Sequence, residues 1–226
     1  MRTEAVILDL DGTLVDHAGA VRAALAAWLP SLGCVPGPAV EAAWFAAEDR
    51  HVRAFWSGEI GFAEQRRRRL REVLPLVQGL PDAELDALYA GYVGHYESAW
   101  TAYPDARSAL AQLAGLGLRT AVLTNGATRQ QNVKLAAVGL ATLVGPVCTA
   151  EDLGVAKPAP AAYRTVCDRL GAAPARTVHV GDNHDLDVLA ARRAGLRAIH
   201  LDRCDAGPYD EPHRITSLDE LVTRIT

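Results

Sequence analysis

The chain has 226 residues, half of them hydrophobic, which suits one substantial core or a core with a small second domain. A formal net charge of -4 argues against a general nucleic-acid surface, so we expect no nucleic-acid partner. No apolar run approaches the roughly 18 residues that span a bilayer, so we expect no membrane partner either. The 4 cysteines form no CxxC pair and the start lacks a secretory signal, which predicts a reduced, cytoplasmic protein acting on a small molecule.

The first predicted element is a strand at residues 5–10 (AVILDL), followed by a long helical stretch. The strand is a short apolar run ending in acids, as expected for a strand buried on both faces of a parallel sheet. From residue 15 to about residue 100 come amphipathic segments without a convincing strand. Turn signals at residues 30–38, 57–61 and 79–82 divide them into roughly four helices. We therefore predict a helical domain inserted after the first strand.

Basic residues in this chain are almost all arginines. One run, from Arg66 to Arg71, has helical neighbours and so wraps around its helix, which is typical of a solvated surface. Contact with an anionic substrate group is the alternative. Lys134 and Lys157 are the only lysines in the sequence, and a lysine kept at position 157 suggests a chemical role.

The second half of the chain alternates strands and helices. Apolar runs predict strands at residues 119–124, 176–180 and 197–201, with a weaker one around residues 143–148. Helical patterns occupy residues 105–117, 128–140, 159–171 and 185–195, and most of them close on glycine. This alternation predicts an α/β fold with a doubly wound, parallel, Rossmann-like sheet. We assign residues 1–14 and 101–226 to this core and residues 15–100 to the helical domain.

Polar residues follow the predicted strands, at the sheet edge where open parallel sheets bind ligands. In chain order these residues are Asp9, Asp11, Thr124, Asn125, Lys157, Asp182, Asp185 and Asp187.

Asp9 and Asp11 are two residues apart in a segment predicted to be extended, so their carboxylates should converge on one small volume. A cation would relieve their repulsion, and oxygen ligands from Asp9 and Asp182 suit Mg²⁺. One carboxylate can then attack phosphorus while the other donates a proton to the leaving oxygen and later activates water. Lys157 and the Thr124 hydroxyl, with nearby backbone N–H groups, would stabilise the transferring phosphoryl group.

These motifs resemble the haloacid dehalogenase superfamily, in its phosphatase branch, over essentially the whole chain. The shared motifs are Asp9-Leu10-Asp11-Gly12-Thr13, Thr124, Lys157-Pro158, and Gly181-Asp182 with Asp187. The resemblance implies that Asp9 is the nucleophile, forming an aspartyl-phosphate, and a Mg²⁺ ligand. It implies that Asp11 is the general acid and base and binds the metal through its main-chain carbonyl. Asp182 would be the other protein ligand, with Asp187, or alternatively Asp185, supporting the metal waters or Lys157.

The same resemblance implies a phosphate-binding set and a substrate class. The residues that would bind phosphate are Gly12, Thr124, Asn125 and Lys157. Residues 15–100 would form a cap that closes over the site and selects a small phosphorylated metabolite, such as a nucleotide, a sugar phosphate or phosphoglycolate. Relatives that cleave carbon–halogen bonds lack an acid at the position of Asp11, which favours a phosphatase here. A sugar-phosphate mutase and a non-catalytic phosphate-binding module are the alternatives.

Overall fold

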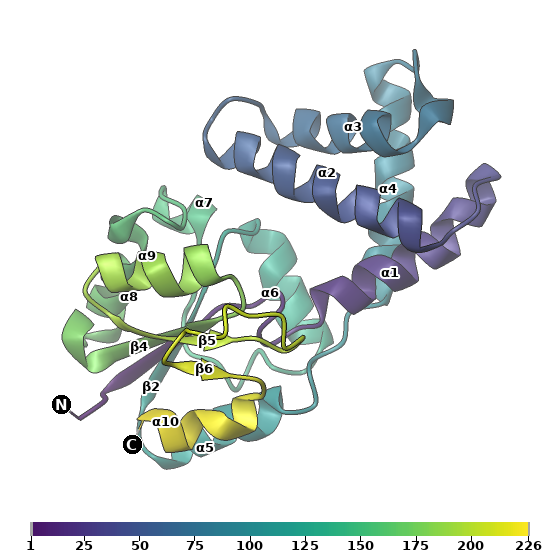
Figure 1. Ribbon diagram of the computed structural model, residues 1–226. Coiled ribbons are helices and arrows are strands. Elements are labelled where there is room, and N and C mark those ends of the chain that lie inside the picture. Colours follow the sequence, from purple (N-terminus) through teal and green to yellow (C-terminus); the bar gives the residue numbers. More distant parts are fainter. Residues whose placement is uncertain (1, 226) are drawn as a thin grey trace. The chain divides into compact units, whose positions relative to one another are not determined.

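The computed structural model describes residues 2–225, which form two compact units (Figure 1). Of these residues, one unit comprises 2–17 with 100–225, and the other comprises Ala18–Ala99. The first unit is built around a sheet and the second is helical. Among residues 2–225, no helix has the length and apolar character that crossing a membrane requires.

The sheet of the first unit has the order β3-β2-β1-β4-β5-β6, and all its neighbouring strands are parallel. Its strands are β1 (Ala5–Leu8), β2 (Arg119–Thr124), β3 (Val147–Thr149), β4 (Thr177–Gly181), β5 (Arg197–Leu201) and β6 (Arg214–Ile215). The order of strands reverses beside β1, which pairs with β2 on one side and β4 on the other. The predicted doubly wound α/β fold is thereby confirmed, and the ends of β1 and β4 mark its ligand-binding crevice.

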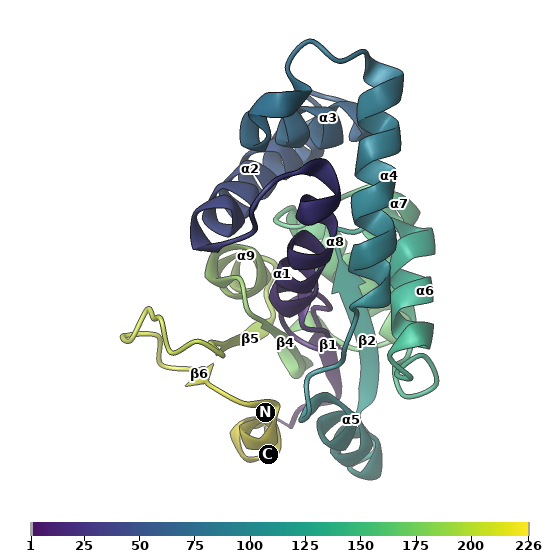
Figure 2. The same cartoon turned by 90° about the vertical axis from the view of Figure 1, so that its right-hand side faces the viewer.

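Helices cover both faces of the sheet, because successive side chains of β1 point to opposite sides. Val6 and Leu8 pack with α5 (Ala106–Gly115), α6 (Thr128–Ala137) and α10 (Leu221–Ile225). Ala5 and Ile7 pack with α8 (Pro160–Leu170) and α9 (Ala190–Arg193) on the other face (Figure 2). A short helix, α7 (Ala150–Leu153), follows β3. The helix predicted at residues 185–195 begins as a π-helix over His184–Leu189 and continues as α9.

The insertion between β1 and β2 is helical, as predicted. It contains α1 (His17–Trp28), α2 (Pro38–Trp56), α3 (Phe62–Val73) and α4 (Asp82–Ser98). Short 3-10 turns at Leu29–Leu32 and Pro75–Val77 occupy two of the connections. The breaks therefore coincide with the Pro- and Gly-rich turn signals of the sequence.

Aromatic rings form the core of this helical unit. The Trp44 side chain is fully buried, with its ring centroid 4.6 Å from that of Tyr92 and 6.0 Å from that of Trp28. Arg69, from the arginine run, is only 3% exposed, and its Nη1 lies 2.8 Å from Glu48 Oε1. The expectation of a solvated surface is wrong for Arg69, because a run that wraps around a helix must turn one member towards the core.

Candidate active site

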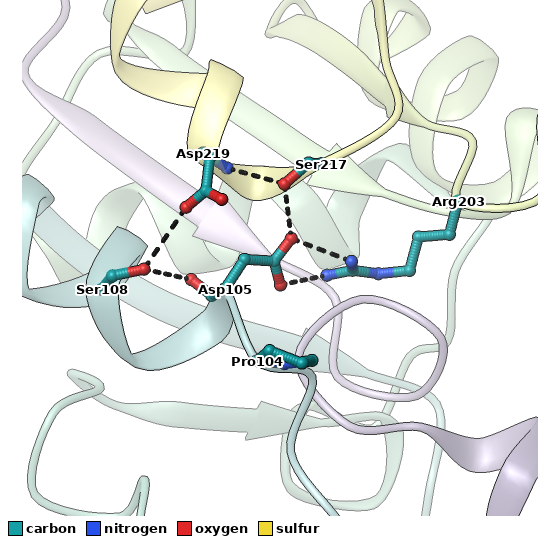
Figure 3. Close-up of a pocket in the computed structure, with 6 residues that line it drawn as sticks. All are labelled: Pro104, Asp105, Ser108, Arg203, Ser217 and Asp219. Carbon is teal, nitrogen blue, oxygen red and sulfur yellow. Dashed lines mark hydrogen bonds and ion pairs between the residues drawn. The ribbon is translucent and has the colours of Figure 1, made fainter.

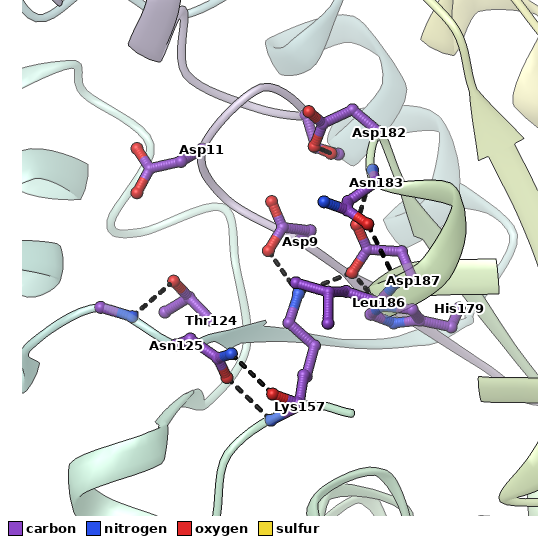
Figure 4. Close-up of polar contacts among 12 residues, drawn as sticks. Asp9, Asp11, Thr124, Asn125, Lys157, His179, Asp182, Asn183, Leu186 and Asp187 are labelled. Carbon is purple, nitrogen blue, oxygen red and sulfur yellow. Dashed lines mark hydrogen bonds and ion pairs between the residues drawn. The ribbon is translucent and has the colours of Figure 1, made fainter. Parts of the chain in front are cut away.

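The predicted site residues of the first unit gather beyond the carboxyl ends of β1, β2 and β4 (Figure 4). Asp9 directly follows β1, and its backbone N–H donates to the Val180 carbonyl in β4 at 2.9 Å. Asp182 directly follows β4. Thr124 is the last residue of β2. Parallel strands bring these positions to one edge of the sheet, as the sequence predicts.

Lys157 is the cation at the centre of this group. Its Nζ lies 2.6 Å from Asp9 Oδ1 and 2.6 Å from Asp187 Oδ1, and its side chain is 3% exposed. Burial alone would lower the pKa of Lys157, but the charges of Asp187 and Asp9 outweigh burial and raise this pKa well above its usual range. The lysine is therefore held charged, next to the predicted nucleophile.

Asn125 fixes the main chain of Lys157. The Asn125 Nδ2 donates to the Lys157 carbonyl at 2.8 Å, and the Lys157 N–H donates to Asn125 Oδ1 at 2.8 Å. Sequence analysis predicts that Asn125 binds phosphate, whereas in this structure both ends of its amide are bonded to the lysine backbone. The strand-end asparagine thus places the ammonium.

Asp187 is buried and accepts three hydrogen bonds. They come from Lys157 Nζ, from His179 Nε2 at 3.1 Å, and from the Asn183 N–H at 3.0 Å. Burial would raise the pKa of Asp187, but Lys157 and His179 hold it well below the usual range. His179, a strand residue that the sequence analysis did not select, therefore supports this carboxylate. Asp185, the alternative to Asp187, is exposed and is not one of the carboxylates that lie together, which are those of Asp9, Asp182 and Asp187.

Three carboxylates form a candidate metal site. Asp9, Asp182 and Asp187 each offer an oxygen atom, and these atoms lie within 4.8 Å of one another. Burial and the charges of the other two carboxylates raise the pKa of Asp9 well above its usual value, against the opposing effect of Lys157. Asp182 keeps an exposed edge, but loss of water around its carboxylate and the charge of Asp187 raise its pKa to about 7. A hard divalent cation such as Mg²⁺ fits these oxygen donors and would relieve their repulsion.

Glycines allow two of these carboxylates to approach the main chain. Gly12 has φ of 88°, and a Cβ added there would lie 2.3 Å from Asp182 Oδ2. A Cβ at Gly181 would lie 2.2 Å from Asp187 Cγ. No other residue fits at either position without displacing a carboxylate, so Gly12, predicted to bind phosphate, also makes room for the candidate metal site.

Asp11 lies outside this carboxylate group, and its carboxylate points away from Asp9 (Figure 4). The predicted convergence of these two residues is wrong, because β1 ends at Leu8 and the chain then turns, with the Leu14 N–H donating to the Leu10 carbonyl at 2.9 Å.

The Asp11 carboxylate instead contacts α6. Its Oδ1 lies 2.5 Å from Lys134 Nζ, and its Oδ2 accepts from Gln131 Nε2 at 2.8 Å. The same Gln131 Nε2 donates to Thr124 Oγ1 at 3.1 Å. Burial would raise the pKa of Asp11, but Lys134 and His17 keep it below its usual value. Sequence analysis missed Lys134 and Gln131, although the rarity of lysine applied to Lys134 as much as to Lys157.

A hollow of the same unit (Figure 3) includes Arg203, which contacts the turn that carries Asp11. It is lined by Pro104, Asp105, Ser108, Arg203, Ser217 and Asp219. Arg203 donates to both oxygens of Asp105 at 2.9 Å and to the Thr13 carbonyl at 2.7 Å. Arg203 therefore joins the turn after β1 to Asp105.

Comparison with known proteins identifies relatives of two chemical kinds. Residues 3–195 match the haloacid dehalogenase-like hydrolases. A phosphoserine phosphatase from Thermus thermophilus is 33% identical over 178 residues, covering 78% of this chain and 68% of the relative. A HAD-hydrolase from Bacillus subtilis, YfnB, solved bound to magnesium, has the same fold with a TM-score of 0.84 and 21% identity, covering 100% of both chains. The structure of a dehalogenase aligns with a TM-score of 0.78 and 26% identity, covering 98% of this chain and 96% of that one.

Proposed function

The chain belongs to the haloacid dehalogenase-like hydrolases, and from that premise we propose that it is a magnesium-dependent phosphomonoester hydrolase. The observation that supports this proposal best is the arrangement around Asp9. Its Oδ1 is bonded to buried Lys157, and its carboxylate lies in a cluster with those of Asp182 and Asp187. A carboxylate beside a fixed cation and a candidate metal site suits attack on an anionic phosphate.

In this proposal Asp9 attacks phosphorus, the bond to the leaving oxygen breaks, and an aspartyl-phosphate forms. Asp11 donates a proton to the leaving oxygen and then takes one from the water that releases phosphate and regenerates Asp9. Lys157 and the Thr124 hydroxyl stabilise the negative charge on the phosphoryl oxygens. Bound by Asp9 and Asp182, with Asp187 in support, Mg²⁺ would neutralise negative charge on the phosphate.

We propose a small phosphorylated metabolite as the substrate. Similar proteins include phosphatases of phosphoserine, glyceraldehyde 3-phosphate and phosphoglycolate. We assign selection among such substrates, including nucleotides and sugar phosphates, to the helical insert at residues 15–100. A dehalogenase is the second candidate, because its structure aligns with nearly the whole chain. Asp11 argues against it, since a leaving halide needs no proton.

The first experiment measures phosphate release from nucleotides, sugar phosphates, phosphoglycolate, phosphoserine and an aryl phosphate, with Mg²⁺ and with EDTA. We expect Mg²⁺-dependent release that Asp9→Asn abolishes and that Asp185→Asn, which removes an exposed acid of the same segment, leaves intact. Substantial turnover by Asp9→Asn would exclude the covalent route. Chloride release from a 2-chloro acid without metal would favour the dehalogenase, and conversion of a sugar phosphate without phosphate release would favour the mutase.

A further inference from the structure

His179 is a fully buried histidine that takes no part in the proposed bond-making steps. It lies in β4 between Val178 and Val180, which are also buried. A buried imidazole needs a hydrogen-bond partner to offset its loss of water, so an aliphatic residue would serve the core of the sheet better. The partner is Asp187, whose Oδ1 lies 3.1 Å from His179 Nε2 (Figure 4). The histidine therefore contributes a hydrogen bond to the candidate site from the interior of the sheet.

His179 and Lys157 share one oxygen of Asp187. Lys157 Nζ lies 2.6 Å from the same Oδ1, while Oδ2 accepts from the Asn183 N–H at 3.0 Å. Because an ionised carboxylate only accepts hydrogen bonds, His179 Nε2 is the donor. The lysine side chain has four flexible carbons, so it cannot by itself fix the carboxylate that holds its own ammonium. The imidazole and the Asn183 main chain supply the fixed side of this contact.

Tyr163, on α8, supports both the histidine and the segment that carries Asp187. Its ring lies edge-on to the His179 ring, with the centroids 5.4 Å apart and the planes at 86°. Its hydroxyl donates to the Leu186 carbonyl, in the π-helical turn directly before Asp187. Such turns are rare and often occur at functional sites. Since Tyr163 is itself fully buried, its packing restricts rotation of the imidazole.

We propose that His179 is a positioning residue for Lys157 that acts through Asp187, an inference that rests on the proposed phosphatase function. Asp187 fixed in this way holds the ammonium against Asp9. A cation stabilises charge developing on a phosphoryl group best when its place is set in advance. Without the histidine donor, Asp187 keeps the Asn183 N–H on one oxygen but turns more freely, so the ammonium is no longer fixed. We therefore expect slower turnover with little change in KM.

The test compares substitutions of the histidine that differ in one hydrogen-bond donor. His179→Gln keeps an N–H near the place of Nε2, His179→Asn ends one methylene short of Asp187, and His179→Leu has no donor. With Mg²⁺ and the best ester of the wild type, we expect kcat to fall about 10- to 100-fold in the Leu and Asn variants, with KM changed less than about threefold. The Gln variant should stay within about threefold of the wild type.

Thr177→Val is the matched control in the same strand. It removes a buried hydrogen bond to the Ala173 carbonyl, two residues before His179, and should leave kcat unchanged. Equal losses in the Gln and Asn variants, or an equal loss in Thr177→Val, would overturn the inference and assign His179 to the fold. The double variant His179→Leu/Asp187→Asn should be no slower than Asp187→Asn alone, and additive losses would show that the histidine does not act through Asp187.

Crystal structures of the wild type and the His179 variants provide a readout that does not depend on turnover. We expect the Asp187 carboxylate and the Lys157 ammonium to be displaced in His179→Leu and His179→Asn and to keep their places in His179→Gln. Unmoved atoms in the Leu and Asn variants would overturn the inference. Failure of the wild type to release phosphate from any ester would refute the phosphatase proposal itself, while these structures would still test the placement of Lys157.

Discussion

Replacing Lys157 by methionine tests the electrostatics of the site directly. The change removes the ammonium that lies 2.6 Å from both Asp9 and Asp187 and leaves two buried carboxylates without their cation. Breaking one partner of a buried ion pair costs about 3–5 kcal/mol, so we expect the free energy of unfolding in EDTA to fall by about that amount. Mg²⁺ should then stabilise the variant more than the wild type, because it supplies positive charge to the same carboxylates.

The assay is urea unfolding at pH 7.5, with EDTA and with Mg²⁺, for the wild type and Lys157→Met. When Mg²⁺ is in excess, each tenfold increase in its affinity adds about 1.4 kcal/mol to the free energy of unfolding. The gain in stability on adding Mg²⁺, compared between the variant and the wild type, therefore reports the change in Mg²⁺ affinity. Lys134→Met is the matched control, since it removes a buried lysine whose partner, Asp11, lies outside the carboxylate group. An equal Mg²⁺ effect in Lys157→Met and the wild type would refute the idea that the ion binds at these carboxylates.

Three further predictions follow from individual contacts. Gly12→Ala should weaken Mg²⁺ binding at least about tenfold, because its methyl group would displace Asp182, and unchanged Mg²⁺ dependence of the melting temperature would contradict this. Mg²⁺ affinity should decrease as pH falls through about 7, because Asp182 of the metal-free protein then takes up a proton that metal binding must release. Calorimetry in buffers of different ionisation enthalpy would detect this proton release at pH 6 and little of it at pH 8.5. Arg69→Met should cost about 3–5 kcal/mol in urea unfolding by removing the buried cation of its ion pair with Glu48, and Arg68→Met, which removes an exposed ion pair, less than about 1 kcal/mol. Similar values for the two variants would show that burial of Arg69 is not what matters.

The fold was largely readable from the sequence because its elements have strong local patterns. Continuous apolar runs identified β1, β2, β4 and β5, and turn residues separated the helices of the insert. The shorter strands were harder. β3 lies at Val147–Thr149, later than the predicted run at residues 143–148, and the two-residue β6 was not predicted. Strands this short are defined by pairing with a neighbour, here β5 for β6, rather than by a sequence period.

By itself, the sequence determined which residues reach the ligand-binding edge of the sheet. Asp9, Thr124 and Asp182 were found because parallel strands end at the same edge, so position along the chain is enough to group them. The tertiary structure decided which side chains pair there: Asp11 pairs with Lys134 and lies outside the cluster of Asp9, Asp182 and Asp187. Such choices depend on the direction of each side chain and on partners more than a hundred residues away, and a local pattern of residue types contains neither.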